Sequence, residues 1–137
     1  MDPKKEMYRK RGAILAGNLT RRQFDAHYCD SREEALQKAL ELVPDGAAVG
    51  WGGAMSAQQI GLMDALRSKP VTLFDRETAQ SQEERTAILK QCLTANVFLI
   101  GANALSLDGQ MVNIDGTGNR AAAIAFGPDT VLVIAGM

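Results

Sequence analysis

The chain has 137 residues, of which 46% are hydrophobic and 23% are charged, and its formal net charge is −1. This length is enough for one domain with a hydrophobic core of its own. The near-neutral charge argues against nucleic acid or a membrane surface as a partner, no apolar run is long enough to span a membrane, and no signal peptide is visible.

Helical and strand-like patterns alternate from the N-terminus onward. Asp2 and Pro3 predict the start of a helix that runs to about Ala16 and is stopped by Gly17-Asn18. The alternation of apolar and polar residues then predicts a strand over residues 23–29.

Capping signals mark the next helices. The segment Ser31-Arg-Glu-Glu34 is a capping box that opens a helix through Val43, and Ser81-Gln-Glu-Glu84 opens another. Between them, Ser56 is predicted to begin a helix with Gln59 at the capping-box position. Short apolar runs between these helices predict further strands, at residues 47–51, 71–74, 96–101 and 130–135.

The stretch from Ser106 to Phe126 combines several local signals and organises the second half of the chain. Asp108-Gly109 between two apolar runs predicts a hairpin. Two glycines follow, and either Asp115 or Thr117 is placed to cap a helix over residues 121–126. A strand, a glycine-rich turn and a helix start together favour anion binding by free backbone N–H groups.

The alternation of strands and helices predicts a three-layer α/β/α domain with a mixed, mostly parallel sheet. Unbroken apolar runs are typical of central parallel strands. We therefore expect the strands near residues 47–51, 96–101 and 130–135 to be central, and we expect the hairpin to make the sheet mixed.

Two glycine-rich strand ends predict one ligand site, because ligands of open α/β sheets bind outside the carboxyl ends of the strands. Neither has the spacing of a dinucleotide fingerprint or a P-loop. The predicted ligand-binding residues are Gly50, Trp51, Gly52, Gly53, Ser56, Asn113, Asp115, Gly116, Thr117, Gly118, Asn119 and Arg120.

Arg120 is predicted to grip a carboxylate or phosphate, with Arg120→Ala weakening anion binding by about 1.5–3 kcal/mol and little loss of folding. A plainer interpretation stays open. The second loop is then a tight turn before a capped helix, and Arg120 pairs with an acid such as Asp115 and only braces the loop. Trp51 either walls the pocket or fills space over the sheet.

Metal and cofactor chemistry have little support in the sequence. Cys29 and Cys92 are predicted to be reduced, mostly buried thiols of a cytoplasmic protein. Two cysteines cannot supply the four ligands of an iron–sulfur cluster, and His27 adds too little for a zinc site. We therefore expect no metal and no bound cofactor. No catalytic residue can be assigned, although Asp108 and Asp115 are the candidate acids.

Four segments together resemble the LUD domain, the family of the LutC and YkgG lactate-utilisation proteins. They are Val49–Ser56, Phe74–Arg76, Gly101–Ser106 and Asp108–Arg120. The resemblance extends from about Gln23 to the end, and 108–120 is its most specific part. It implies a fold like that of NagB/RpiA-type isomerases and CoA transferases, in a single domain over residues 1–137. Because family members usually continue past this point, it also implies that the family's C-terminal part is missing.

The resemblance implies a role in bacterial oxidation of L-lactate to pyruvate, as a subunit without a cluster that accompanies iron–sulfur proteins. A free-standing enzyme acting on a phosphorylated or CoA-linked small molecule is an alternative, and a partner-binding module without catalysis is another. We expect a small anionic ligand, carboxylate or phosphate. The exposed hairpin and the lack of a covering helix after Ala135 predict a homo-oligomer or a partner contact.

Overall fold

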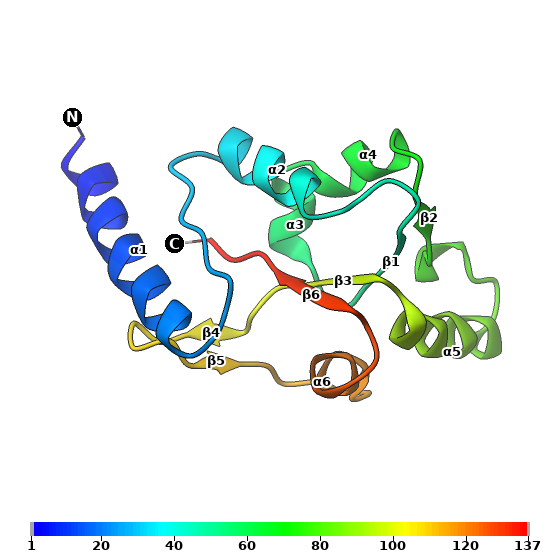
Figure 1. Ribbon diagram of the computed structural model, residues 1–137. Helices are drawn as coiled ribbons and strands as arrows, with labels where there is room; N and C mark the ends of the chain where they lie inside the picture. The colour runs from blue at the N-terminus through cyan, green and yellow to red at the C-terminus, as the bar shows by residue number, and fades with distance from the viewer. Residues whose placement is uncertain (1, 137) are drawn as a thin grey trace.

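The computed structural model describes residues 2–136, so what was expected of the chain end at Met137 lies outside it (Figure 1). The main sheet has four parallel strands in the order β2-β1-β3-β6. These strands are β1 (Ala48–Trp51), β2 (Thr72–Leu73), β3 (Val97–Ile100) and β6 (Thr130–Val133). In the register of the sheet, Val49 lies opposite both Leu73 and Val97.

Helices cover both faces of this sheet, which confirms the predicted three-layer α/β/α architecture. In Figure 1, α2, α3 and α4 lie on one side of the strands and α5 and α6 on the other, while α1 packs beside the hairpin. The α-helices are α1 (Pro3–Arg21), α2 (Arg32–Glu41), α3 (Met55–Gln59), α4 (Leu62–Arg67), α5 (Gln82–Gln91) and α6 (Asn119–Ala125), and two short 3₁₀ turns are η1 (Arg76–Thr78) and η2 (Cys92–Thr94). None of the helices within residues 2–136 is long and apolar enough to cross a membrane.

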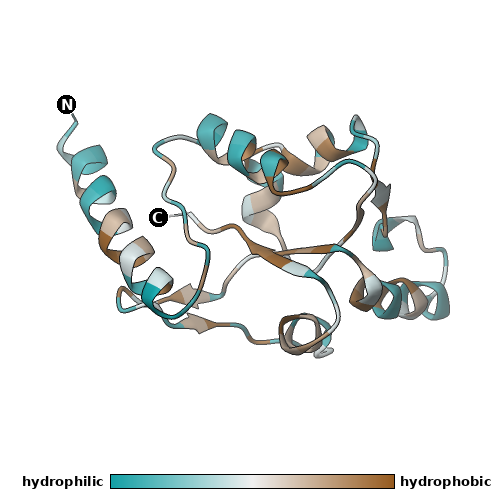
Figure 2. Cartoon of the chain, viewed as in Figure 1, coloured by the Kyte–Doolittle hydropathy of each residue, from teal (hydrophilic) through white to brown (hydrophobic). Residues whose placement is uncertain are grey.

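Strand β3 joins two hydrophobic cores, one on each face of the sheet. Val97 and Leu99 pack with the core under α2, α3 and α4, whereas Phe98 and Ile100 pack with the core under α5 and α6. All four side chains are buried, as expected for a central strand whose faces are both covered. Figure 2 shows β3 and β6 among the most hydrophobic parts of the fold, while the first turns of α1 are hydrophilic.

Both capping boxes are confirmed. The Oγ of Ser31 accepts a hydrogen bond from the Glu34 N–H, and the Oγ of Ser81 accepts one from the Glu84 N–H, each at 3.1 Å. Each side-chain oxygen satisfies one of the free N–H groups of the first turn, which fixes where α2 and α5 begin. The fixed starts of α2 and α5 also position the loops that precede these two helices, including the loop between β2 and α5.

The third predicted helix is wrong in its start and its length. Helix α3 begins at Met55, after Ala54, without a side-chain cap, and it ends at Gln59. Gly61 then takes a positive φ of 83° and a second helix, α4, follows. The left-handed conformation at Gly61 breaks the continuous helix that the apolar periodicity suggested.

The expected strand at residues 23–29 is wrong, because this segment is irregular and pairs with no strand among the described residues. It packs on α1 instead. A Cβ atom at Gly12 of α1 would lie only 2.2 Å from the ring of Tyr28, and Arg9 donates two hydrogen bonds to Asp30. An extended segment with one face on a helix shows the same alternation of apolar residues as a strand.

Helix α1 does not stop at Gly17-Asn18 but continues to Arg21. The Asp108-Gly109 hairpin is present, with β4 (Ala104–Leu105), β5 (Met111–Val112) and Gly109 at φ 94°. It forms a two-stranded sheet of its own, so it does not join the main sheet. The Asn18 side chain donates to the Leu107 carbonyl at 2.9 Å, and this contact extends the helix past its predicted stop.

The expectation that residues 130–135 form a central strand is also wrong. Strand β6 pairs with β3 and lies at one edge of the sheet within the described residues. Its apolar residues face the two helical layers. An unbroken apolar run therefore indicates that both faces of a strand are covered, but it does not indicate whether the strand has one neighbouring strand or two.

Candidate functional site

A cleft of about 380 Å³ lies where the chain leaves β1 and β3. Such strand ends are the usual position of ligand sites in open α/β sheets. Its walls come from the segment after β1, from η1, from the segment after β3 and from α6. The lining residues are Trp51, Gly52, Gly53, Ala54, Met55, Ser56, Gln58, Arg76, Glu77, Gly101, Ala102 and Arg120.

The glycines after β1 allow the backbone and Arg120 to approach each other closely. A Cβ atom at Gly52 would lie 2.4 Å from the Cγ of Arg120, which is too close for any other residue without a shift. The Gly52 N–H donates to the Leu99 carbonyl and the Gly101 N–H to the Gly53 carbonyl, so both strand ends are held together. The N–H groups of Gly53 and Ala54 donate to no acceptor within residues 2–136.

Arg120 is held by three acceptors from the loop that precedes α6 and from the segment after β3. Its Nε donates to Asp115 at 2.5 Å, and its Nη2 donates to the Asn103 side chain at 2.9 Å and to the Ile114 carbonyl at 2.7 Å. The Arg120 side chain is only 13% exposed. Its Nη1 makes no hydrogen bond to any described residue and lies beside Gly53, 3.6 Å from where a Cβ would be.

The Asp115 carboxylate places a negative charge of the protein itself at the start of α6. Its second carboxylate oxygen accepts from the Ala121 N–H at 2.7 Å, and its side chain is 6% exposed. This confirms that Asp115 satisfies the first turn, although the residue at the N-cap position is Gly118. Burial by itself would raise the pKa of Asp115, but the hydrogen bonds from Arg120 and Ala121 outweigh it, so this pKa lies below its ordinary value.

The contacts of Arg120 therefore match the plainer interpretation more closely than the first one. Arg120 braces the loop by pairing with Asp115, as the alternative described. Arg120→Ala would leave a buried carboxylate without its partner, so the expected small effect on folding does not follow from this geometry. What stays available for a ligand is the Nη1 group.

The structure brings together part of the predicted site. Trp51, Gly52, Gly53, Ser56 and Arg120 line the cleft. Trp51 is also buried in the core under α2, α3 and α4, so it serves as a wall and as core at once. The predicted residues that do not line the cleft are Gly50, Asn113, Asp115, Gly116, Thr117, Gly118 and Asn119.

These other residues have identifiable positions. Gly50 lies within β1 under Cys92, where a Cβ would come within 2.6 Å of the Sγ atom. The Oδ1 atom of Asn113 is buried and has no hydrogen-bond partner among the described residues. Residues 116–118 are exposed on the turn before α6, and Asn119 is its first residue.

Two residues outside the predicted set contribute to the site. Arg76 lines the cleft beside Glu77; the place of Asp75-Arg76 at a predicted strand end suggested contact with this cleft, while local capping or a turn explained the pair as well. The structure shows both, since the Asp75 carboxylate accepts from the Glu77 N–H at the start of η1. Asn103 orients Arg120, and only its position after a strand pointed to it.

Comparison with known protein families gives one match that spans both cleft loops. Residues 13–137 match the family model of the LUD domain. Comparisons with curated proteins and with solved structures give no match.

Proposed function

Because the chain belongs to the LUD domain family, we propose that it is a ligand-binding subunit of a bacterial L-lactate utilisation system and carries no cluster itself. The family is associated with lactate-utilisation proteins, and this supports the general role. The cleft after β1 and β3 is the proposed site for the carboxylate of lactate or pyruvate.

One observation carries this proposal: residues with unused hydrogen-bond donors line a single cleft. These donors are the Nη1 of Arg120 and the backbone N–H groups of Gly53 and Ala54. Arg76 adds a second positive charge, against the single carboxylate of Glu77. Donors around a small anion in this arrangement match a planar carboxylate, which accepts through two oxygens.

An isolated enzyme has less support than a binding subunit. Asp115, one of the candidate acids, is tied to Arg120 and stays ionised at neutral pH, so it is no proton donor there. Asp108 lies in the hairpin turn, near Arg22, and does not line the cleft. Glu77 is the one carboxylate among the described residues that line it.

Oxidation of lactate to pyruvate releases two electrons, so we propose that iron–sulfur partner proteins in the cytoplasm accept them. Residues 2–136 contain no group of three or more side chains placed to hold a metal ion. Burial also raises the pKa of both Cys29 and Cys92, which disfavours the thiolate form that binds metal. Exposed apolar side chains on and near β5 and α6 are the proposed contacts for such a partner or for a second copy: Val112, Ile114, Ile124 and Phe126, the last 89% exposed.

Calorimetry with lactate and pyruvate tests the proposed site. We expect Gly53→Ala to weaken binding severalfold, because its new methyl group would stand in ordinary contact with the Arg120 guanidinium, inside the cleft. Gly17→Ala is the matched control, since nothing lies within 4 Å of that position on α1. The proposal fails if neither acid binds the unmodified protein, or if Gly53→Ala binds them as tightly as Gly17→Ala.

A further inference from the structure

A second cleft adjoins the first and has a different character. Its volume is about 330 Å³, at the lower end of the range for small-ligand sites. It lies between η1 and the start of α5, and polar or charged side chains supply nearly all of its lining. The lining residues are Arg76, Glu77, Ala79, Gln80, Ser81, Gln82 and Arg85.

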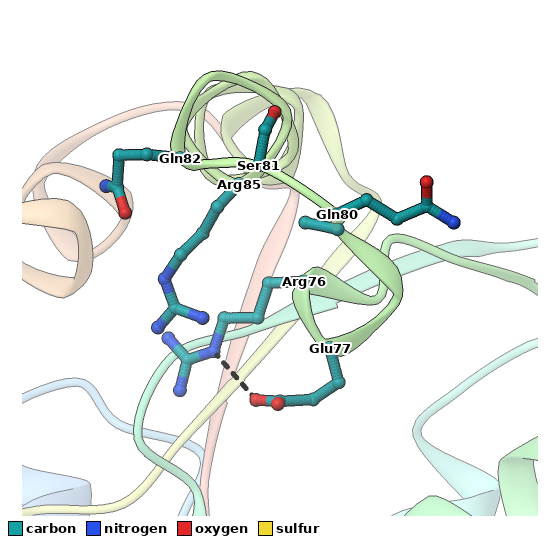
Figure 3. A pocket seen from close by; sticks show the side chains of 7 residues that line it. Arg76, Glu77, Gln80, Ser81, Gln82 and Arg85 are labelled. Atoms are coloured by element: carbon teal, nitrogen blue, oxygen red, sulfur yellow. Dashed lines mark ion pairs between the residues drawn. The ribbon is translucent and has the colours of Figure 1, made fainter.

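Two arginines from separate elements meet in this cleft. Both line it, and Figure 3 shows the side chains of Arg76, from η1, and Arg85, from α5, extending toward the same part of the cleft. Two positive charges lining one cleft favour an anion there. Arg67 and Arg120 differ from this pair, because each lies within hydrogen-bond distance of a carboxylate.

The donors of both arginines are unused within residues 2–136. Among the described residues, the Nε of Arg76 is buried and has no hydrogen-bond partner, and the guanidinium of Arg85 makes neither a hydrogen bond nor an ion pair. Glu77 approaches Arg76 only to 3.8 Å, beyond hydrogen-bond range, and its side chain is 72% exposed. Because this Nε is almost inaccessible, the donors that can face a ligand are the Nη groups of Arg76 and the guanidinium of Arg85.

The nearby carboxylates are engaged elsewhere. Asp75 accepts from the Glu77 N–H and lies 3.9 Å from Arg67. Glu84 accepts from the Gln80 N–H, and neither Glu84 nor Glu83 lines the cleft. Two arginine charges therefore face the single, exposed charge of Glu77.

We propose that this second cleft binds the phosphate group of a small phosphorylated molecule. A phosphate offers three oxygens to the donors of two guanidinium groups, whereas a carboxylate offers two in one plane. Ser81, Gln80 and Gln82 also line the cleft, but Figure 3 shows the Ser81 hydroxyl and the two amide groups turned away from the guanidinium groups, so the two arginines carry the proposal.

This site goes beyond the proposed lactate role and does not depend on it. The two clefts share Arg76 and Glu77, so a ligand in one lies beside a ligand in the other. Arg85 lines only the second cleft and Gly53 only the first. These two residues therefore separate the phosphate site from the carboxylate site.

The test is calorimetry at low ionic strength with inorganic phosphate and with glycerol phosphate. We expect Arg85→Gln to weaken the binding of both by about tenfold or more, the effect of one lost charged hydrogen bond. Glu77→Gln is expected to tighten binding severalfold, because it removes the one opposing charge. Lys90→Gln, on the same helix but outside the cleft, is the matched control and is expected to bind within about twofold of the unmodified protein.

Thermal unfolding of each variant shows that a loss of binding is not a loss of folding. If Gly53→Ala loses pyruvate binding and keeps phosphate binding while Arg85→Gln does the reverse, the second site is supported as distinct. The phosphate site is overturned if the unmodified protein binds neither phosphate nor glycerol phosphate. It is equally overturned if Arg85→Gln binds as the unmodified protein does, or if Lys90→Gln weakens binding as much as Arg85→Gln.

Discussion

Removing either partner of the Arg120–Asp115 pair should destabilise the protein far more than removing a surface ion pair. The two side chains are 13% and 6% exposed, and Asp115 also holds the first turn of α6 through Ala121. Arg120→Ala leaves a buried carboxylate without its main partner. Asp115→Ala leaves a nearly buried guanidinium with only the Asn103 and Ile114 oxygens.

The expected cost of each single substitution is about 3–5 kcal/mol of unfolding free energy, the range for breaking a buried ion pair by removing one partner. The double substitution leaves no unpaired charge, so it should cost about as much as either single one. The coupling energy of the pair is then equal in size to one single cost, about 3–5 kcal/mol. Domains have about 5–15 kcal/mol of stability, so the variants are expected to fold, with a lower unfolding midpoint.

Urea unfolding followed by circular dichroism measures these values for the four members of the cycle. The pair Arg67–Asp64 is the internal comparison, because its side chains are 53% and 88% exposed although the atoms lie 2.8 Å apart. Arg67→Ala should cost at most about 1 kcal/mol. If Arg120→Ala and Asp115→Ala also cost less than about 1 kcal/mol and their effects add, the bracing role of Arg120 is refuted.

Three further outcomes follow from the contacts. The pKa of Asp115 is lowered on folding, so its contribution to stability is present at neutral pH and is lost as the pH falls below the ordinary value of 3.8. The difference in unfolding free energy between the unmodified protein and Asp115→Asn should shrink over that range. A constant difference would contradict the lowered pKa. Gly50→Ala should cost about 1–3 kcal/mol in urea unfolding, because its Cβ would lie 2.6 Å from the Sγ of Cys92, whereas Gly17→Ala, inside helix α1, should stabilise slightly; a Gly50→Ala variant that is no less stable than the unmodified protein would count against this packing. Burial raises the pKa of both thiols, so access decides the difference: buried Cys92 should react with iodoacetamide at neutral pH far more slowly than half-buried Cys29, and mass spectrometry that finds equal rates would disprove its burial.

Local signals predicted the fold well where one residue decides the geometry. Ser31 and Ser81 place the starts of α2 and α5 through a single side-chain hydrogen bond each, and Gly109 fixes the hairpin turn. The apolar run of β3 predicted a strand buried on both faces, because four consecutive apolar side chains in a strand need cover on both faces of the sheet.

The predictions failed where distant parts of the chain decide the outcome. Residues 23–29 have strand-like alternation, but the Tyr28 ring packs against Gly12 of α1, and no strand among the described residues pairs with the segment. Helix α1 passes its expected stop because Asn18 reaches the hairpin, 89 residues further along the chain. Neither contact has a signature in the local sequence.

The site was predictable in position and less so in detail. The two glycine-rich loops pointed to the strand ends, and the structure places Gly52 against Arg120 there. The second loop also offered the alternative that the structure shows, in which Asp115 satisfies the start of α6 and pairs with Arg120, but its composition did not decide between this and anion binding. Arg85 gave no sequence signal, because a charged residue one turn into a helix is ordinarily a solvated side chain.

Nuclear magnetic resonance titration with pyruvate tests the proposed carboxylate site most directly. The amide protons of Gly53 and Ala54 have no acceptor among the described residues, so a bound carboxylate should shift their signals more than any others. We expect the two signals to move together and saturate at one pyruvate concentration. Signals that do not move, or that move only around Arg85 and Gln82 in the second cleft, would contradict carboxylate binding at the ends of β1 and β3.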